Sequence, residues 1–184
     1  MPTETITTTS FTSILINSLF SVGVILSIIS LFLPSNYILN ITSYSLFIAG
    51  LFVLIIKIQQ QQTVETNDIL KFIQSFLLNL GPFILLSGLI IYLMYLTIRY
   101  KTIISSGHVS SSYSVFNNIS ILFLCIQIYV FYRAMNQPSY KEKKVIPVMY
   151  NSFIYLLTLI NFIIVLTISN ILKYFSTDGW TNPF

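Results

Sequence analysis

Long apolar runs separated by short polar segments dominate the pattern of this chain. Five runs are continuous enough to predict membrane-spanning helices, at residues 11–33, 38–56, 82–100, 113–132 and 148–172. A helix needs about 20 mostly apolar residues to cross the hydrocarbon core of a bilayer, because each residue adds about 1.5 Å. The pattern therefore predicts an all-α fold, an integral membrane helical bundle in a single membrane domain over residues 1–184.

The first two runs are separated only by residues 34–36. Pro34 ends the first helix because proline cannot continue a helix. So short a connection predicts a tight antiparallel hairpin of the first two spans.

The segment before the third run is amphipathic. Its polar side chains recur three and four residues apart on one helical face: Asp68, Lys71, Ser75 and Asn79. Gly81 and Pro82 then interrupt the pattern, as expected where one helix ends and the next begins. We expect an interfacial amphipathic helix at 68–80 that leads into the third span. The alternative is one kinked helix whose polar stripe faces the bundle.

The fourth run is the weakest. Its apolar part, residues 119–132, is about 21 Å long as a helix, short of the roughly 30 Å of a bilayer core. Extension back to Tyr113 supplies the length but places Asn117 and Asn118 within the headgroup zone or slightly deeper. We expect five spans, and four is the alternative.

Composition supports a membrane protein. Of the 184 residues, 55% are hydrophobic and 8% charged, against roughly 45–50% and 25% in soluble domains. So few charged groups cannot cover a soluble fold, which excludes a soluble enzyme, a disordered tail and a nucleic-acid-binding domain. No nucleic-acid partner is expected.

The charged residues avoid the centres of the predicted spans. All nine basic and five acidic residues fall in loops, termini or helix ends, where long basic side chains reach the interface. Charges inside spans typically mark proton relays, ion paths and voltage sensors. Their absence argues against a proton-coupled transporter, a proton-pumping subunit and a voltage sensor.

The basic residues also predict an orientation. With five spans, one side of the membrane carries six of them: Lys57, Lys71, Arg133, Lys141, Lys143 and Lys144. The other side carries three: Arg99, Lys101 and Lys173. Because cytoplasmic loops retain an excess of Lys and Arg, the N-terminus is expected to be cytoplasmic. The N-glycosylation patterns at Asn40 and Asn118 fall on the far side.

Neutral polar residues remain inside the spans. In the fifth span they share one broad face: Asn151, Tyr155, Thr158 and Asn161. Asn17, Asn79 and Gln127 could meet this face across the bundle. Such groups form interhelical hydrogen bonds, and a polar pore lining is the alternative. The small residues Gly23 and Ser27, and the pairs Ala49-Gly50 and Ser87-Gly88, predict close helix contacts, either within the chain or with a partner.

Four basic residues around the loop between the fourth and fifth spans form a candidate contact for anionic lipid headgroups or an acidic partner. They are Arg133, Lys141, Lys143 and Lys144. No catalytic, metal-ligating or cofactor-binding residues are predicted, and no cofactor is expected.

The end of the chain carries a resemblance. From Tyr155 to Gly179, a last membrane helix closes on Lys173-Tyr-Phe-Ser-Thr-Asp-Gly179. This segment resembles small, uncharacterised multi-pass membrane proteins of giant DNA viruses. The resemblance covers about a seventh of the chain and implies a virion internal membrane or a host membrane.

These observations favour a non-enzymatic multi-pass membrane protein with a structural or assembly role in a viral membrane. The alternatives are an oligomeric channel or passive transport protein, and an accessory subunit of an energy-transducing membrane complex. The expected partners are the lipid bilayer and other membrane or virion proteins or further copies of the chain.

The five-span topology predicts that the two termini lie on opposite sides of the membrane. A protein tagged at both ends and treated with protease in sealed vesicles should lose one tag and keep the other. Protection of both tags, or loss of both, would contradict five spans.

Overall fold

The computed structural model describes residues 3–33, 36–61, 73, 80–106, 109–138 and 146–177. Its elements in this part of the chain are all helices: α1 (Thr3–Phe32), α2 (Tyr37–Gln61), α4 (Gly81–Arg99), α5 (Lys101–Ser105), α6 (Ser110–Met135) and α8 (Val148–Thr177). The predicted all-α class is therefore confirmed.

Five of these helices are long and apolar enough to cross a membrane, judged by length and composition. The apolar stretches are Phe11–Phe32, Tyr37–Ile58, Gly81–Arg99, Ser111–Met135 and Val148–Ser176. The fourth is long enough for a full span, because the 26 residues of α6 extend about 39 Å. It is longer than the apolar part at residues 119–132. The structure has five such helices among the described residues rather than four, which fits an integral multi-pass membrane protein.

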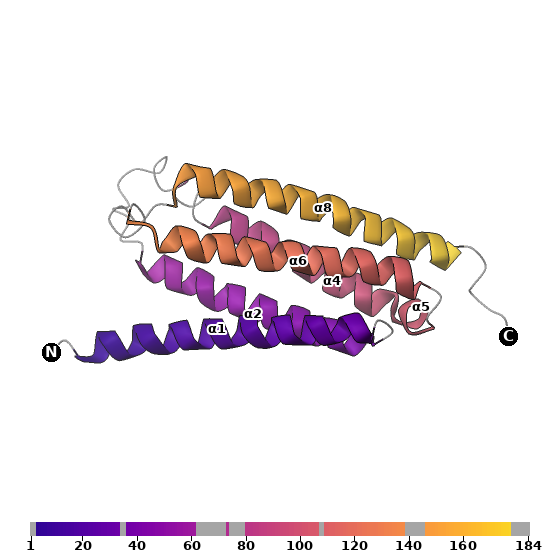
Figure 1. The fold of residues 1–184 in the computed structure, drawn as a ribbon, viewed down its shortest axis with the longest axis horizontal. Helices are drawn as coiled ribbons and strands as arrows, with labels where there is room; N and C mark the ends of the chain where they lie inside the picture. The colour runs from indigo at the N-terminus through magenta and orange to yellow at the C-terminus, as the bar shows by residue number, and fades with distance from the viewer. Residues whose placement is uncertain are drawn as a thin grey trace.

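The long helices run side by side along one axis (Figure 1). The pair α1 and α2 forms one edge of the bundle, α8 the other, and α4 and α6 lie between them. Successive long helices alternate in direction, so the start of α1 and the end of α8 lie at opposite ends.

The hairpin of α1 and α2 has the tight form that the sequence predicts. The backbone N–H of Asn36 donates to the Leu33 carbonyl at 2.9 Å. The Asn36 Oδ1 accepts from the backbone N–H groups of Ile38 and Leu39 at 3.2 and 3.4 Å, so its side chain caps α2 as asparagine commonly does. The α1–α2 interface is the most extensive between described helices.

The third span, α4, begins at Gly81, where the Gly81-Pro82 pair interrupts the sequence pattern. Leu80 is the residue before α4, and its carbonyl accepts from the backbone N–H groups of Phe83 and Ile84 at 3.0 and 3.1 Å. Of the expected amphipathic helix at 68–80, only Ile73 and Leu80 belong to the described residues. The structure therefore does not distinguish a separate amphipathic helix from one kinked helix, because the rest of this segment lies outside the described residues.

Small residues bring α1 and α2 close together. Ser43 Oγ lies 2.9 Å from the Gly23 carbonyl oxygen and 2.5 Å from Ser27 Oγ. Gly50 faces the ring of Phe20, and a Cβ placed on Gly50 would lie 2.8 Å from Phe20 Cε1. The small residues of both helices therefore make a contact within the chain.

We expect Gly50→Leu to destabilise the bundle by about 1–3 kcal/mol, because the added side chain must displace Phe20 from a packed interface. Titration of the purified protein from a mild detergent into SDS measures this loss. Ala49→Leu is the matched control, since Ala49 is exposed on the same helix. Equal stability of the two variants would contradict the α1–α2 packing.

Candidate functional site

The buried face of α6 is polar along much of its length. Tyr113, Asn117, Ser120 and Gln127 are all at most 2% exposed, and their spacing of four, three and seven residues places them on one side of the helix. We call these four residues the α6 polar stripe. Because α6 lies between the other spans, the stripe meets partners on three of them.

One half of the stripe contacts α2 and α4. The hydroxyl of Tyr44 on α2 donates to Asn117 Oδ1, and Asn117 Nδ2 donates to Asn40 Oδ1 at 3.5 Å. The hydroxyls of Tyr113 and Thr97 lie 3.0 Å apart. These bonds join three helices through side chains that are at most 2% exposed.

The other half contacts α8. Ser120 Oγ donates to Asn161 Oδ1 at 2.6 Å. Gln127 Nε2 donates to Thr158 Oγ1 at 2.8 Å and to the Ile154 carbonyl at 3.3 Å. The polar face predicted on the fifth span therefore meets polar groups of α6 through Thr158 and Asn161.

Three buried polar atoms have no hydrogen-bond partner among the described residues. They are Gln127 Oε1, Asn151 Oδ1 and Asn161 Nδ2. Each such atom costs about 1–3 kcal/mol when it is removed from water unpaired. All three belong to the α6–α8 side of the bundle, so the polar contacts there are incomplete, whereas those with α2 and α4 leave no such atom.

The residues singled out from the sequence lie in different places. Gln127, Asn151, Thr158 and Asn161 are buried, whereas Asn17 is exposed and lines a groove of about 330 Å³ between α1 and α6. The expectation that Asn17 faces the fifth span across the bundle is wrong, because α1 packs at the edge of the bundle against α2. Asn79 lies outside the described residues.

The sequence did not identify most of the buried polar groups as interhelical contacts. Those missed include Asn40 and Tyr44 on α2, Thr97 on α4, and Tyr113, Asn117 and Ser120 on α6. The signal available was the helical spacing of residues 113, 117, 120 and 127 in the fourth run. It was hard to recognise because Leu124, Phe131 and Ala134 share that face.

The buried Asn40 also bears on glycosylation. Its side chain is 2% exposed and bonded to Asn117, so the folded protein does not present it to a modifying enzyme. Asn118 is half-buried, and its Nδ2 donates to Ser114 Oγ at 3.1 Å within the same helix.

The described charges lie at the ends of the bundle. Lys57 Nζ donates to Ser13 Oγ at 2.6 Å. At the opposite end, Arg99 Nη1 donates to the Tyr95 hydroxyl at 2.5 Å, and its guanidinium lies 5.6 Å from the Tyr100 ring centroid. Such an arrangement fits cations at a membrane interface next to aromatic rings.

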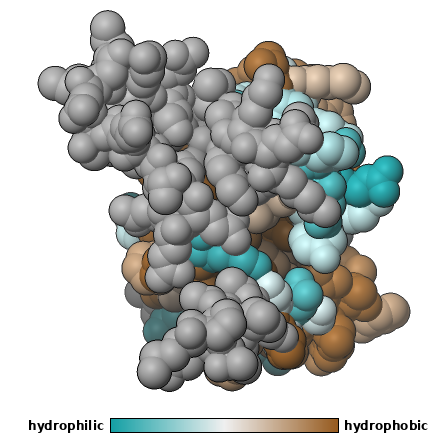
Figure 2. Space-filling view, turned by 90° about the vertical axis from the view of Figure 1, so that its left-hand side faces the viewer, coloured by the Kyte–Doolittle hydropathy of each residue, from teal (hydrophilic) through white to brown (hydrophobic). Residues whose placement is uncertain are grey.

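The candidate basic contact is described only at its first residue. Arg133 is exposed in the last turn of α6, at the end of the bundle that Figure 2 faces. Hydrophilic residues gather on this end, and hydrophobic residues cover the flank beside it (Figure 2). Lys141, Lys143 and Lys144 lie outside the described residues.

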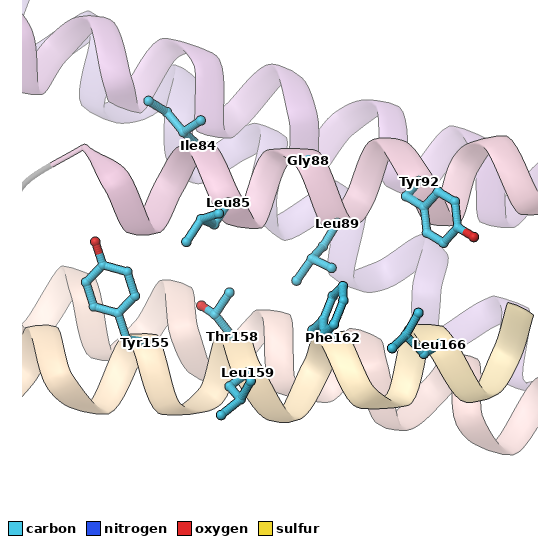
Figure 3. Close-up of a pocket in the computed structure, with 10 residues that line it drawn as sticks. All are labelled: Ile84, Leu85, Gly88, Leu89, Tyr92, Tyr155, Thr158, Leu159, Phe162 and Leu166. Atoms are coloured by element: carbon cyan, nitrogen blue, oxygen red, sulfur yellow. The ribbon is translucent and has the colours of Figure 1, made fainter. Parts of the chain in front are cut away.

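A groove of about 610 Å³ lies between α4 and α8 (Figure 3). Ten residues line it: Ile84, Leu85, Gly88, Leu89, Tyr92, Tyr155, Thr158, Leu159, Phe162 and Leu166. A Cβ placed on Gly88 would have no atom within 4 Å. Gly88 therefore makes no close helix contact within the described chain, because α4 and α8 stand apart there.

We expect Asn117→Ala to destabilise the protein by about 1–2 kcal/mol, because it leaves Tyr44 and Asn40 without their partner in an apolar interior. The neighbouring Asn118→Ala is the control, since it removes a bond within one helix and should change stability by a few tenths of a kcal/mol. Unfolding of both variants in mixed detergent micelles measures the difference. A larger loss in Asn118→Ala would contradict the α2–α6 contact.

Comparison of the chain with family models, with curated proteins and with solved structures finds no match in any of the three. The functional conclusion therefore rests on the sequence and on the geometry described above.

Proposed function

We propose that the chain is a non-enzymatic membrane protein with a structural or assembly role, which acts by packing against lipid and neighbouring membrane proteins. The observation that carries this proposal is the chemistry of the buried polar side chains. The buried polar side chains of the described residues are neutral hydroxyls and amides, and most bond to one another across helices. Such bonds hold helices together in a membrane.

The ends of the bundle support a role in contact. Arg133 is exposed, and Lys141, Lys143 and Lys144 follow it within eleven residues of the sequence. Each basic residue near an anionic membrane surface contributes about 1 kcal/mol of attraction. We propose that this end of the protein binds anionic lipid headgroups or an acidic partner.

The membrane in question is proposed to be viral. The support is the resemblance of residues 155–179 to membrane proteins of giant DNA viruses. In this proposal the chain lies in the internal membrane of a virion, or in a host membrane used during assembly, with its N-terminus cytoplasmic.

A channel is the second candidate, and a specific observation favours it. The unpaired atoms Gln127 Oε1, Asn151 Oδ1 and Asn161 Nδ2 are what a partly polar path between α6 and α8 would contain. Against it, such a path needs polar groups along its full length. Leu124, Phe131 and Phe83 are at most 2% exposed on the buried faces, and the rings of the two phenylalanines lie 4.0 Å apart.

We expect the tagged protein, cross-linked in its native membrane and purified in mild detergent, to carry membrane or capsid proteins in fixed ratio. Replacement of Lys141, Lys143 and Lys144 by Gln should weaken this capture if the basic end makes the contact. Subunits of a redox complex would instead favour the accessory-subunit alternative.

The same preparation reconstituted in a planar bilayer should show no conductance above that of protein-free membranes. Reproducible conductance that Gln127→Leu and Asn161→Leu abolish would overturn the structural proposal in favour of the channel.

A further inference from the structure

The groove between α4 and α8 is not explained by the proposed function. It lies at middle depth in both helices: Tyr155 and Leu166 mark its ends on α8, which runs from Val148 to Thr177. Five of its lining side chains are between 42% and 57% exposed: Ile84, Leu85, Leu159, Phe162 and Leu166. The groove therefore opens sideways, toward the bilayer.

Tyrosine side chains bridge the two helices at both ends of the groove. At one end the Tyr155 hydroxyl lies against Gly81, where a Cβ would be 2.6 Å from the hydroxyl oxygen. At the other end the hydroxyls of Tyr92 and Ser169 lie 3.1 Å apart. Between these contacts stands Gly88, whose missing side chain leaves the space open (Figure 3).

The chemistry of the lining requires an apolar occupant. Leucine, isoleucine and phenylalanine side chains make up most of the wall. The hydroxyl of Thr158 donates to the Ile154 carbonyl at 2.8 Å and accepts from Gln127 Nε2, so it is already engaged on the interior side. The Tyr92 hydroxyl is bonded to Ser169. A charged or strongly polar ligand would lose its solvation here without compensation.

The size of the groove suits a small, elongated ligand. From Tyr155 to Leu166 the groove extends about 16 Å along α8, at a rise of about 1.5 Å per residue. Its volume of about 610 Å³ is on the scale of small-molecule sites, about 300–1,000 Å³.

From these observations we propose that the groove is a binding site for one hydrocarbon tail of a membrane lipid, which lies along α8 and fills the space above Gly88. The spans stand among acyl chains, so the tail enters from the side without crossing water. The tail gains van der Waals contact with two helices, which is the main force between apolar surfaces inside a bilayer. This site is independent of the proposed function.

Photolabelling tests the site. The full chain is reconstituted in vesicles that contain phosphatidylcholine with a diazirine near the end of one acyl chain, and labelled peptides are mapped after irradiation. We expect Leu89 and Leu159 to be labelled several-fold more than Leu122 and Ile91. The latter two residues are exposed at similar depth, with exposed fractions of 57% and 54%, but do not line the groove.

Gly88→Leu should remove this excess, because a side chain at this position has room to fill the groove without displacing the backbone. Ala49→Leu adds the same side chain at an exposed position of α2 and should leave the labelling unchanged. Equal labelling of groove and reference residues would overturn the proposal. So would cross-links in the groove to a second copy of the chain, and so would a Gly88→Leu variant that folds and keeps the excess.

Discussion

Polar groups inside a bilayer have no water to bond, so they must find their partners within the protein. The arrangement of α6 follows from this constraint. Its stripe of tyrosine, asparagine, serine and glutamine would be costly toward lipid, and it is instead turned inward, where α2, α4 and α8 supply hydroxyls, amides and a carbonyl. α6 is therefore rotated with its polar face toward α2, α4 and α8, while its opposite face, which carries Leu122 and Tyr129, stays exposed.

The same constraint separates the two sides of the bundle. Toward α2 and α4, the amide of Asn117 and the hydroxyl of Tyr113 are engaged with groups of matching type. Toward α8, glutamine and asparagine atoms remain unpaired, and on its outer face α8 stands away from α4 over a groove. The packing of α8 against its neighbours thus leaves more unpaired polar atoms and open space than the packing of α1 against α2, where the Phe20 ring contacts Gly50. A tightly packed pair and a more open side coexist in one small membrane domain.

The sequence could predict much of the fold and less of the site. Span number, the hairpin at Asn36 and the start of the third span at Gly81-Pro82 were predictable, because they depend on local length and on residues that end or begin helices. The prediction for Asn17 was wrong because an asparagine in a span indicates that its side chain needs a hydrogen-bond partner. It does not indicate whether another helix covers that face. The sequence could not say whether Gly88 contacts another helix of the chain, since a small residue permits an approach without requiring one.

By itself, the sequence determined that the chain is a helical membrane protein and where its spans lie, since bilayer thickness translates directly into a length of apolar residues. It also placed the charges at the helix ends. Only the tertiary structure decided that Asn117 meets Tyr44, that Gln127 meets Thr158, and that α4 and α8 leave a groove over Gly88. These depend on how each helix is rotated about its axis and which helix stands beside it, and both are set by side-chain packing across residues far apart in the chain.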